Sequence, residues 1–376
     1  MNLFEHKRDL NRLSFDKIQK QFRESIGYGK KMKEGSVLLR RFVAAVSVIL
    51  VVAAILTGCA SRRAEWNIQN PYAGVDWTRY QQHKANFHTH TTMSDGSGTP
   101  QEVIDRYHAL GYTILALTDH DTMGTERTTW PWQAFDRDPE TLGMVAIEGN
   151  EISGVHHIGS YFNDYGDAGV DSEDAVIKEI GRRGGLAVLF HPGRYTKPVG
   201  WYVEMYRAYP QLIGFEMYNQ GDRYSHDRKT WDAILTDIVT ERPVWGFSND
   251  DMHRPRTQLG RNWNVMLLPE LSGEGVRRSI ENGAFFFVYA LDDHNGAPLP
   301  TIKSISVDLQ QGIIHIDATN HENIEWISRG IIVHRGHHVN LSKLSNLGGY
   351  IRAEIRSGDG GSIVGTQPFR IQSSAK

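Results

Sequence analysis

The sequence is poor in cysteine, and that scarcity excludes several kinds of site. Its 376 residues include one cysteine, Cys59, so the chain has neither an intrachain disulfide framework nor a cysteine-based metal site. A basic surplus is also absent: the formal net charge of −3 argues against stable nucleic-acid binding. The sequence contains no Gly-x-Ser-x-Gly elbow, the motif that would indicate a serine hydrolase. Histidine, with 17 positions, is the residue in surplus, and its placement carries the information.

The apolar run at residues 42–57 is shorter than the roughly twenty residues that a spanning helix needs, and is typical of a secretory signal core. It ends in Leu56-Thr57-Gly58-Cys59, which resembles the bacterial lipobox. We therefore expect Cys59 to be lipidated, with a plain N-terminal membrane anchor as the alternative.

This interpretation makes residues 1–59 a cytoplasmic leader and lipoprotein signal peptide, with translation starting at Met1 or, by preference, at Met32. Residues 60–84 would form a linker and tether. The protein would then lie in the bacterial cell envelope, facing the periplasm or the exterior, with the membrane as a partner through its lipid anchor.

Residues 85–122 place several metal-type ligands in one strand–helix–strand unit. His88 and His90 stand two residues apart at the end of a predicted strand, so they share one face. A helix is predicted to begin at Thr99, where Thr99-Pro100-Gln101-Glu102 forms a capping box. The next apolar strand, 112–118, leads directly to His120.

Strand and helix patterns alternate through residues 85–296, which predicts a (β/α) barrel with a largely parallel sheet. Most candidate side chains stand at or just after the carboxyl end of a strand, which is the face that carries barrel active sites. They are His88, His90, His120, Glu151, His191, Glu216, Asp251 and His253, with Asp95 in the first loop.

These motifs resemble those of the PHP family of polymerase and histidinol phosphatase metal-dependent phosphoesterases. The matching segments are His88-Thr89-His90 with Asp95, Thr118-Asp119-His120, Gly149-Asn150-Glu151-Ile152-Ser153, His191-Pro192 and Asp251-Met252-His253. The resemblance implies a distorted (β/α)7 barrel, and is nearest to the bacterial branch that includes carbamate- and ester-hydrolysing enzymes. One further ligand falls on His156, with the adjacent His157 as the alternative.

The resemblance implies two or three divalent ions, and imidazole with carboxylate suits Zn, Mn or Fe. We expect His88, His90, Glu151 and Asp251 around one ion, His156 and His191 at a second shared through Glu151, and Asp95, His120 and His253 at a third. A metal-bridging hydroxide would attack the substrate. Glu151, Asp251 and His191 are the expected catalytic residues.

Residues around the expected ligands supply further candidates. Arg194 is the candidate for binding a substrate phosphate, and Glu216 could line the substrate pocket. Asp119 and Asp250 are expected to orient ligand imidazoles. Glu148, an odd number of residues before Glu151, should point away from the ligands.

The pattern changes to period two after the proline-containing segment at 296–300. About six short strands without helical signals predict a small all-β sandwich over residues 297–376. We expect this domain to pack on the barrel or to bind a partner.

Three functions are compatible with these patterns. The first is a metal-dependent phosphoesterase acting on a nucleotide or another small-molecule phosphate ester. The second is a carbamate, ester or amide hydrolase with the same metal cluster, because ligands alone do not separate attack on phosphorus from attack on carbon. The third is a non-catalytic metal-binding envelope lipoprotein, against which the complete ligand set argues.

Overall fold

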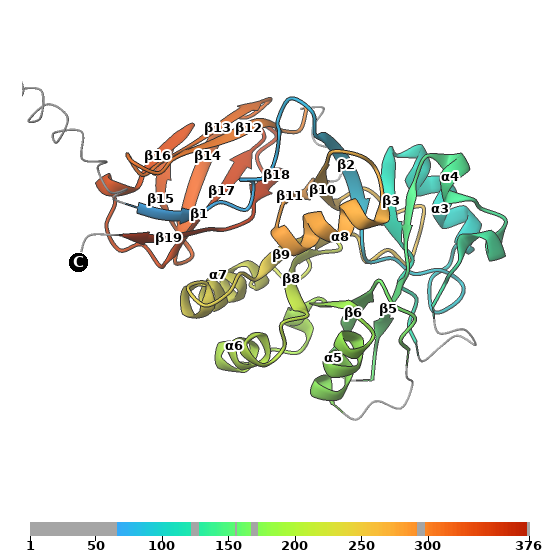
Figure 1. The fold of residues 1–376 in the computed structure, drawn as a ribbon. Helices are drawn as coiled ribbons and strands as arrows, with labels where there is room; N and C mark the ends of the chain where they lie inside the picture. Colours follow the sequence, from blue (N-terminus) through green and yellow to red (C-terminus); the bar gives the residue numbers. More distant parts are fainter. Residues whose placement is uncertain (1–65, 122–127, 155, 167–171, 292–297, 374–376) are drawn as a thin grey trace, which may run out of the picture. The chain divides into compact units, whose positions relative to one another are not determined.

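The computed structural model describes residues 66–121, 128–154, 156–166, 172–291 and 298–373 (Figure 1). The predicted signal peptide and Cys59 lie outside this part of the chain. Within it, no helix is both long enough and apolar enough to cross a membrane. The described elements form a mixed α/β fold, which confirms the predicted fold class.

Strands of the barrel region divide between two sheets. In the first, β2 (Gln81–Asn86), β3 (Tyr112–Ala116) and β4 (Val145–Ile147) are parallel. β10 (Asn262–Leu268) pairs antiparallel with both β2 and β11 (Phe285–Tyr289). The second sheet has the order β5 (Gly149–Ile152), β6 (Ile158–Tyr161), β7 (Leu186–Leu189), β8 (Leu212–Asn219) and β9 (Trp245–Asn249).

Strand directions differ from the mostly parallel prediction, because β6 runs antiparallel to both of its neighbours. β5 and β6 are joined by a short connection, which suits an antiparallel pair, whereas parallel strands need a longer crossover. Two isolated parallel bridges, Thr89 with Met252 and His120 with Glu151, join the two sheets where the strands end. The candidate ligands cluster at these bridges.

Helices alternate with these strands along the described part of the chain. They are α3 (Pro100–Ala109), α5 (Glu173–Arg182), α6 (Val199–Ala208), α7 (Asp227–Ile238) and α8 (Gly273–Asn282), with short turns α4 (Pro139–Leu142), η1 (Trp132–Phe135) and η2 (Pro192–Arg194). At α3, the Thr99 hydroxyl accepts a hydrogen bond from the Glu102 amide at 3.2 Å, as the capping box predicts. Helices α5, α6 and α7 pack beside strands β7 and β8 (Figure 1).

The C-terminal strands form two layers. One sheet contains β12 (Thr301–Asp308), β13 (Ile313–Thr319) and β16 (His338–Asn340), followed by the turn η4 (Leu341–Lys343). The other contains β14 (Asn323–Ser328), β15 (Ile331–Arg335), β17 (Tyr350–Arg356), β18 (Ile363–Thr366) and β19 (Phe369–Ser373). Buried Ile314, Trp326 and Ile351 belong to one core between them.

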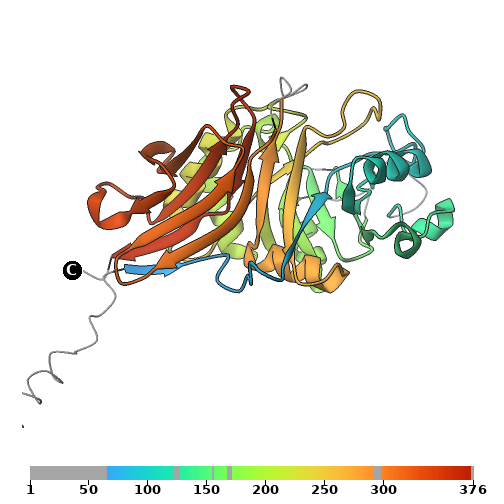
Figure 2. The same ribbon diagram turned by 90° about the horizontal axis from the view of Figure 1, so that it is seen from above.

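Strand pairing continues across the predicted boundary at residue 297. β11 of the barrel region pairs antiparallel with β18, so one sheet runs through both parts (Figure 2). The predicted tether also differs from the structure over residues 66–84. Residues Trp66–Gln69 form β1, which pairs with β19, and the Tyr72 hydroxyl donates to the Phe285 carbonyl at 3.1 Å. Tyr72 is buried because aromatic neighbours cover it, a feature that the linker prediction missed.

Candidate metal centre

Strand ends of both sheets converge on a cavity of about 570 Å³. The structure brings eight of the nine predicted ligands together there: His88, His90, Asp95, His120, Glu151, His191, Asp251 and His253. Regular pairing of β2 ends at Asn86, and the chain continues through the Thr89 bridge to carry His88 and His90 inward. Buried histidines in such numbers require acceptors or metal ions around them.

His88 and His90 face the same two carboxylates. Their Nε2 atoms lie 3.2 and 3.1 Å from Oδ1 of Asp251, and 3.4 and 3.2 Å from Oε2 of Glu151. Two ligands held roughly 2.1 Å from one ion at 90–110° lie about 3.0–3.4 Å apart. Each carboxylate thus stands at this spacing from both imidazoles. The ligand atoms of His88, His90 and Asp251 all lie within 4.8 Å of one another, whereas Glu151 groups with His88 and His191, so the predicted set of four around one ion divides between two groups.

Glu151 turns its second oxygen toward another pair of imidazoles. Its Oε1 lies 2.7 Å from Nδ1 of His157 and 3.0 Å from Nε2 of His191. One carboxylate thus faces two groups of histidines, as a bridging ligand does. The position of Glu151 inside β5, almost fully buried, makes this orientation rigid.

Asp95 gathers a third group at the cavity rim. Its oxygens lie 3.4 Å from Nε2 of His253, 3.6 Å from Nε2 of His120 and 3.6 Å from Nδ1 of His90. The three partners come from the ends of three different strands. His90 belongs to both the first and the third group, so the groups form one continuous cluster.

His157, rather than His156, enters the cluster, which corrects the choice made from the sequence. His156 is buried against the rings of Tyr195 and Trp201, with ring centroids 4.3 and 5.8 Å away. Burial lowers the pKa of His156 to about 3, so its imidazole is neutral. His157, next to the start of β6, faces Glu151 instead, with its Nδ1 atom 2.7 Å from Oε1.

Glu216 does not line the cavity, which corrects its assignment as a substrate-binding residue. It is fully buried on β8, and its Oε1 lies 3.0 Å from Nδ1 of His88. The same carboxylate accepts hydrogen bonds from the His191 amide and the Asn249 side chain. Glu216 therefore orients the His88 ring so that Nε2 points at the cluster, the usual carboxylate–histidine–metal arrangement.

Asp119 and Asp250 hold loops rather than imidazoles, contrary to the sequence-based expectation. Asp119 accepts from the Thr91 amide at 2.6 Å and from the Ser94 hydroxyl at 2.6 Å, which shapes the loop that carries Asp95. Asp250 accepts from the amides of residues 260–262. Burial raises the pKa of Asp250 to about 6, and these amides oppose the rise.

Backbone geometry at two ligands departs from ordinary conformations. His191 has φ of 30° and Asp251 has φ of 46°, the left-handed region that side chains other than glycine rarely adopt. Such positions occur where the surrounding structure overrides local preference, and they gather at functional sites. His191 faces Glu151 from this turn, and Asp251 faces His88 and His90.

Carboxylates and imidazoles perturb one another strongly. Burial opposes protonation of His88, but the charges of Asp251, Glu216 and Glu151 raise its pKa well above the usual value. Against the same burial, hydrogen bonds to Asp251 and Glu151 raise the pKa of His90 to about 10. Burial opposes ionisation of Glu151, yet the neighbouring histidines hold its pKa well below the usual value. Metal binding would displace these protons and would therefore strengthen as the pH rises.

The donor set fits divalent ions. Nε2 of His88, Nδ1 of His90 and Nδ1 of His191 are buried nitrogens without a hydrogen-bond partner. Leaving buried nitrogens without a hydrogen bond is costly. Coordination of an ion by Nε2 of His88 and Nδ1 of His90 would remove that cost. The ligand atoms form four overlapping groups of three or four, and within each group all atoms lie within 4.8 Å of one another. All of these atoms belong to histidine, aspartate or glutamate. This chemistry suits borderline and hard divalent cations.

Arginines surround the mouth of the cavity. Arg194, the predicted phosphate-binding residue, lines it together with Arg223 and Arg254, which the sequence analysis missed. Arg223 donates to the Gln220 side chain at 3.2 Å, and within the described residues none of the three pairs with a carboxylate. Arg223 lies four residues after Asn219, the last residue of β8, and Arg254 lies one residue after His253. This closeness to strand ends is the feature of the sequence that could have identified both arginines.

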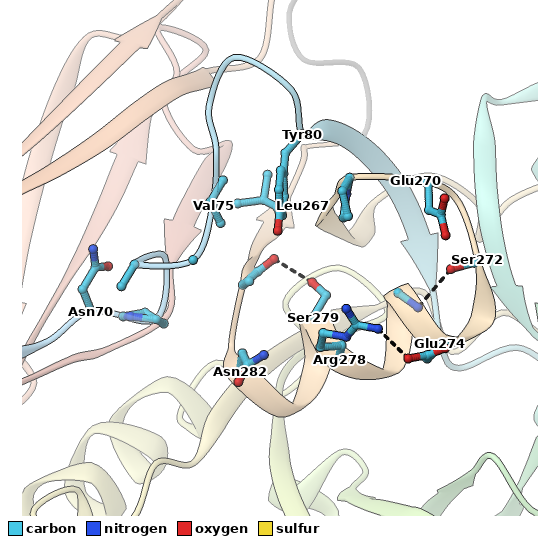
Figure 3. Close-up of a pocket in the computed structure, with 16 residues that line it drawn as sticks. Asn70, Val75, Tyr80, Leu267, Glu270, Ser272, Glu274, Arg278, Ser279 and Asn282 are labelled. Atoms are coloured by element: carbon cyan, nitrogen blue, oxygen red, sulfur yellow. Dashed lines mark hydrogen bonds and ion pairs between the residues drawn. The ribbon is translucent and has the colours of Figure 1, made fainter.

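A second cavity lacks this chemistry. It has a volume of about 430 Å³ and lies between residues 70–80 and helix α8 (Figure 3). No histidine is among the described residues that line it. Ser279 donates to the Ala284 carbonyl, and Arg278 pairs with Glu274, so these polar groups satisfy one another. The cavity that carries the ligand cluster is therefore the candidate functional site.

Comparison with known proteins agrees with the motifs. The PHP domain family matches residues 86–225. A 5'-3' exoribonuclease of Haemophilus influenzae is 34% identical over 87 residues, which are 21% of this chain and 29% of that protein. The match thus spans less than a third of that relative's length.

Two solved structures also resemble this chain. One is a two-domain protein from Bacteroides vulgatus that contains a predicted PHP-like metal-dependent phosphoesterase, with 18% identity, TM-score 0.49, and coverage of 84% of this chain and 92% of that one. The other is an amidohydrolase from Chromobacterium violaceum, with 17% identity, TM-score 0.37, and coverage of 52% and 95%. The PHP domain match at residues 86–225 covers the segment that carries His88, His90, Asp95, His120, Glu151 and His191 of the ligand cluster.

Proposed function

We propose that this protein is a metal-dependent phosphoesterase that hydrolyses a small-molecule phosphate ester, such as a nucleotide. The observation that carries the proposal is the continuous ligand cluster, which lies at a cavity whose mouth bears three arginines. Divalent ions bound there would supply Lewis acidity and an activated water. Two or three ions would account for the overlapping groups.

Residues of the chain itself account for substrate binding. Guanidinium groups bind phosphate oxygens through paired hydrogen bonds, and Arg194, Arg223 and Arg254 are exposed at the cavity. A neutral carbamate or carboxyl ester offers these groups no anionic partner. The arginines therefore favour phosphate esters over the carbamate, ester or amide alternative.

The cluster residues have separable tasks. Glu151 faces both imidazole groups, and Asp251 accepts from the His90 ring at 3.1 Å and from Nδ2 of the Asn219 side chain at 3.1 Å. Glu216 holds the His88 ring in position. Burial of these residues excludes bulk water from the inner side of the cluster, which strengthens electrostatic interactions there.

Metal analysis combined with a substrate panel tests this function. The protein should contain Zn, Mn or Fe and should hydrolyse p-nitrophenyl phosphate or bis(p-nitrophenyl) phosphate, and His88→Ala should abolish that turnover. Arg194→Ala should raise KM for the phosphate esters while the metal content stays unchanged. Turnover that survives His88→Ala would refute the mechanism, and activity confined to aryl carbamates would establish the alternative.

We also propose that Cys59 anchors the protein in the bacterial envelope, facing the periplasm or the exterior. The support is the lipobox-like Leu56-Thr57-Gly58-Cys59 after an apolar run, with Cys59 as the sole cysteine. Metabolic labelling with a fatty acid should mark the wild-type protein, and Cys59→Ser should remove the label. Labelling that persists in the variant would contradict lipidation at this residue.

A further inference from the structure

Strand register places the start of the folded chain beside the β14–β15 turn. Trp66, the first residue of β1, lies opposite Ser373 at the end of β19. The first residues of β19, Phe369 and Arg370, lie beside the start of β17, and β19 then runs antiparallel past that start toward Ser373. The start of β17 lies beside the end of β14. The turn to β15 follows, with Ser328 opposite Ile331. Trp66 and Ile331 therefore occupy the same end of this sheet.

The β12–β13 turn reaches the same end. A Cβ atom built on Gly312 would clash with Cδ1 of Trp66, so the turn packs directly against the tryptophan. The Gly312 carbonyl accepts a hydrogen bond from the Leu341 amide at 2.8 Å, which brings the turn at 341–343 alongside. We call Trp66, Leu309, Arg329, Ile331 and Lys343 the sheet-end surface.

This surface combines exposed apolar groups with exposed basic ones. Leu309 is 47% exposed and Ile331 is 58% exposed, and they are two of the five exposed large hydrophobic residues of the described chain. Arg329 and Lys343 are also exposed. An apolar group flanked by cations matches the interfacial region of a bilayer, where acyl chains meet anionic headgroups.

The length of the preceding chain limits how far this surface can lie from the membrane. Trp66 is the seventh residue after Cys59, so even a fully extended segment spans at most about 25 Å. A lipid attached to Cys59 would thus hold Trp66 close to the headgroups.

We infer that the sheet-end surface rests on the bilayer that anchors Cys59, with Leu309 and Ile331 entering the headgroup region. The inference rests on the lipidation proposed above. The acyl chains on Cys59 attach the protein to the membrane, and the sheet-end surface fixes the orientation of the folded unit relative to the bilayer. Contact at Leu309 and Ile331 would restrict rotation of the folded unit about its short tether, because both side chains must leave the membrane for the unit to turn away.

Fluorescent probes in reconstituted vesicles test the orientation. Once Cys59 is acylated, an introduced cysteine is the sole free thiol, so the full-length variants L309C, I331C and E322C can each be labelled with an environment-sensitive dye. Glu322 is exposed and precedes β14, at the opposite end of the same sheet, which makes E322C the matched control. Vesicles contain phosphatidylethanolamine, phosphatidylglycerol and a doxyl-lipid quencher.

We expect all three proteins to float with the vesicles, and the probes at 309 and 331 to show severalfold stronger quenching than the probe at 322. Equal quenching at the three positions would overturn the orientation and leave the anchor intact. Failure to float would refute the anchor itself. Probes at 309 and 331 that are already shielded in detergent, with crosslinking between chains, would show that a second copy covers the surface, which also overturns the inference.

Discussion

Glu151 divides its carboxylate between two sets of imidazoles. Oε2 faces His88 and His90, and Oε1 faces His157 and His191. At 1% exposure the side chain has little freedom to choose other partners. A residue in this position connects the parts of the cluster, so changes at its neighbours should affect metal binding separately from folding.

His157 and His156 provide a direct comparison of neighbouring residues. His157→Ala should lower metal content and reduce phosphoester hydrolysis by at least about 10- to 100-fold, the loss typical even of residues that only support a ligand. His156→Ala should retain metal but destabilise the fold by about 2 kcal/mol or more, because it empties a buried aromatic site. Elemental analysis and denaturant unfolding distinguish the two. Equal metal content in both variants would refute the role of His157.

Glu216 should control metal affinity without touching the metal. Glu216 receives hydrogen bonds from His88, His191 and Asn249. In Glu216→Gln, one carboxylate oxygen becomes an NH₂ group, which cannot accept a hydrogen bond. Either the His88 ring loses its acceptor, or the new NH₂ group faces the His191 or Asn249 donor. We expect metal affinity to fall by about 10- to 100-fold in a chelator competition assay. Glu148→Gln is the matched control outside the cluster, and an equal loss there would indicate a general carboxylate effect.

At the scale of elements, loops after the strands are shaped by buried acids. Asp119 fastens the loop that carries Asp95, and Asp250 fastens residues 260–262. Asp227, at the start of α7, accepts from the Gly193 amide at 2.9 Å and so connects that helix to the turn carrying Arg194. These contacts lie on loops, where binding residues are commonly placed by a rigid scaffold.

Asp227 should make stability depend on pH. Burial raises its pKa from 3.8 to about 7, so between these values the folded chain binds the proton more tightly than the unfolded chain. The contribution of Asp227 to the free energy of unfolding therefore decreases as the pH rises from about 4 to 7. In metal-free protein, the Tm of the wild type should fall more between pH 5 and pH 8 than that of Asp227→Asn. Identical pH dependence in the two proteins would contradict the raised pKa.

Across the whole folded unit, the C-terminal sheets and the barrel region share a core and a buried ion pair. Arg352 on β17, 2% exposed, bonds to Asp232 on α7 through Nε at 2.9 Å and Nη2 at 2.7 Å. It also bonds to Glu354 at 2.7 Å. Together with the pairing of β11 and β18, this contact indicates that the two parts unfold together.

Arg352→Ala should cost about 3–5 kcal/mol of unfolding free energy, because it leaves the Asp232 carboxylate buried without its partner. Arg335→Ala removes a largely exposed arginine that pairs with Glu325 and should cost about 1 kcal/mol or less. Urea unfolding followed by tryptophan fluorescence and far-ultraviolet dichroism should give one coincident transition for the wild type. Separate transitions would show that the C-terminal sheets unfold independently.

Local patterns determined the ligand types, the strand ends that bear them and the start of helix α3. Paired histidines after a strand, a capping box at Thr99 and short acidic loops are recognisable without tertiary context, because each depends on residues close together in sequence. Mixed α/β organisation and a metal centre follow from them.

Tertiary structure alone decided the rest. Only packing against Tyr195 and Trp201 turns His156 away from Glu151 and leaves His157 facing it. The roles of Glu216, Arg223 and Arg254, and the pairing of β1 with β19, likewise depend on residues distant in sequence. Burial and orientation arise from contacts between separate elements, and such contacts are invisible to patterns within one segment.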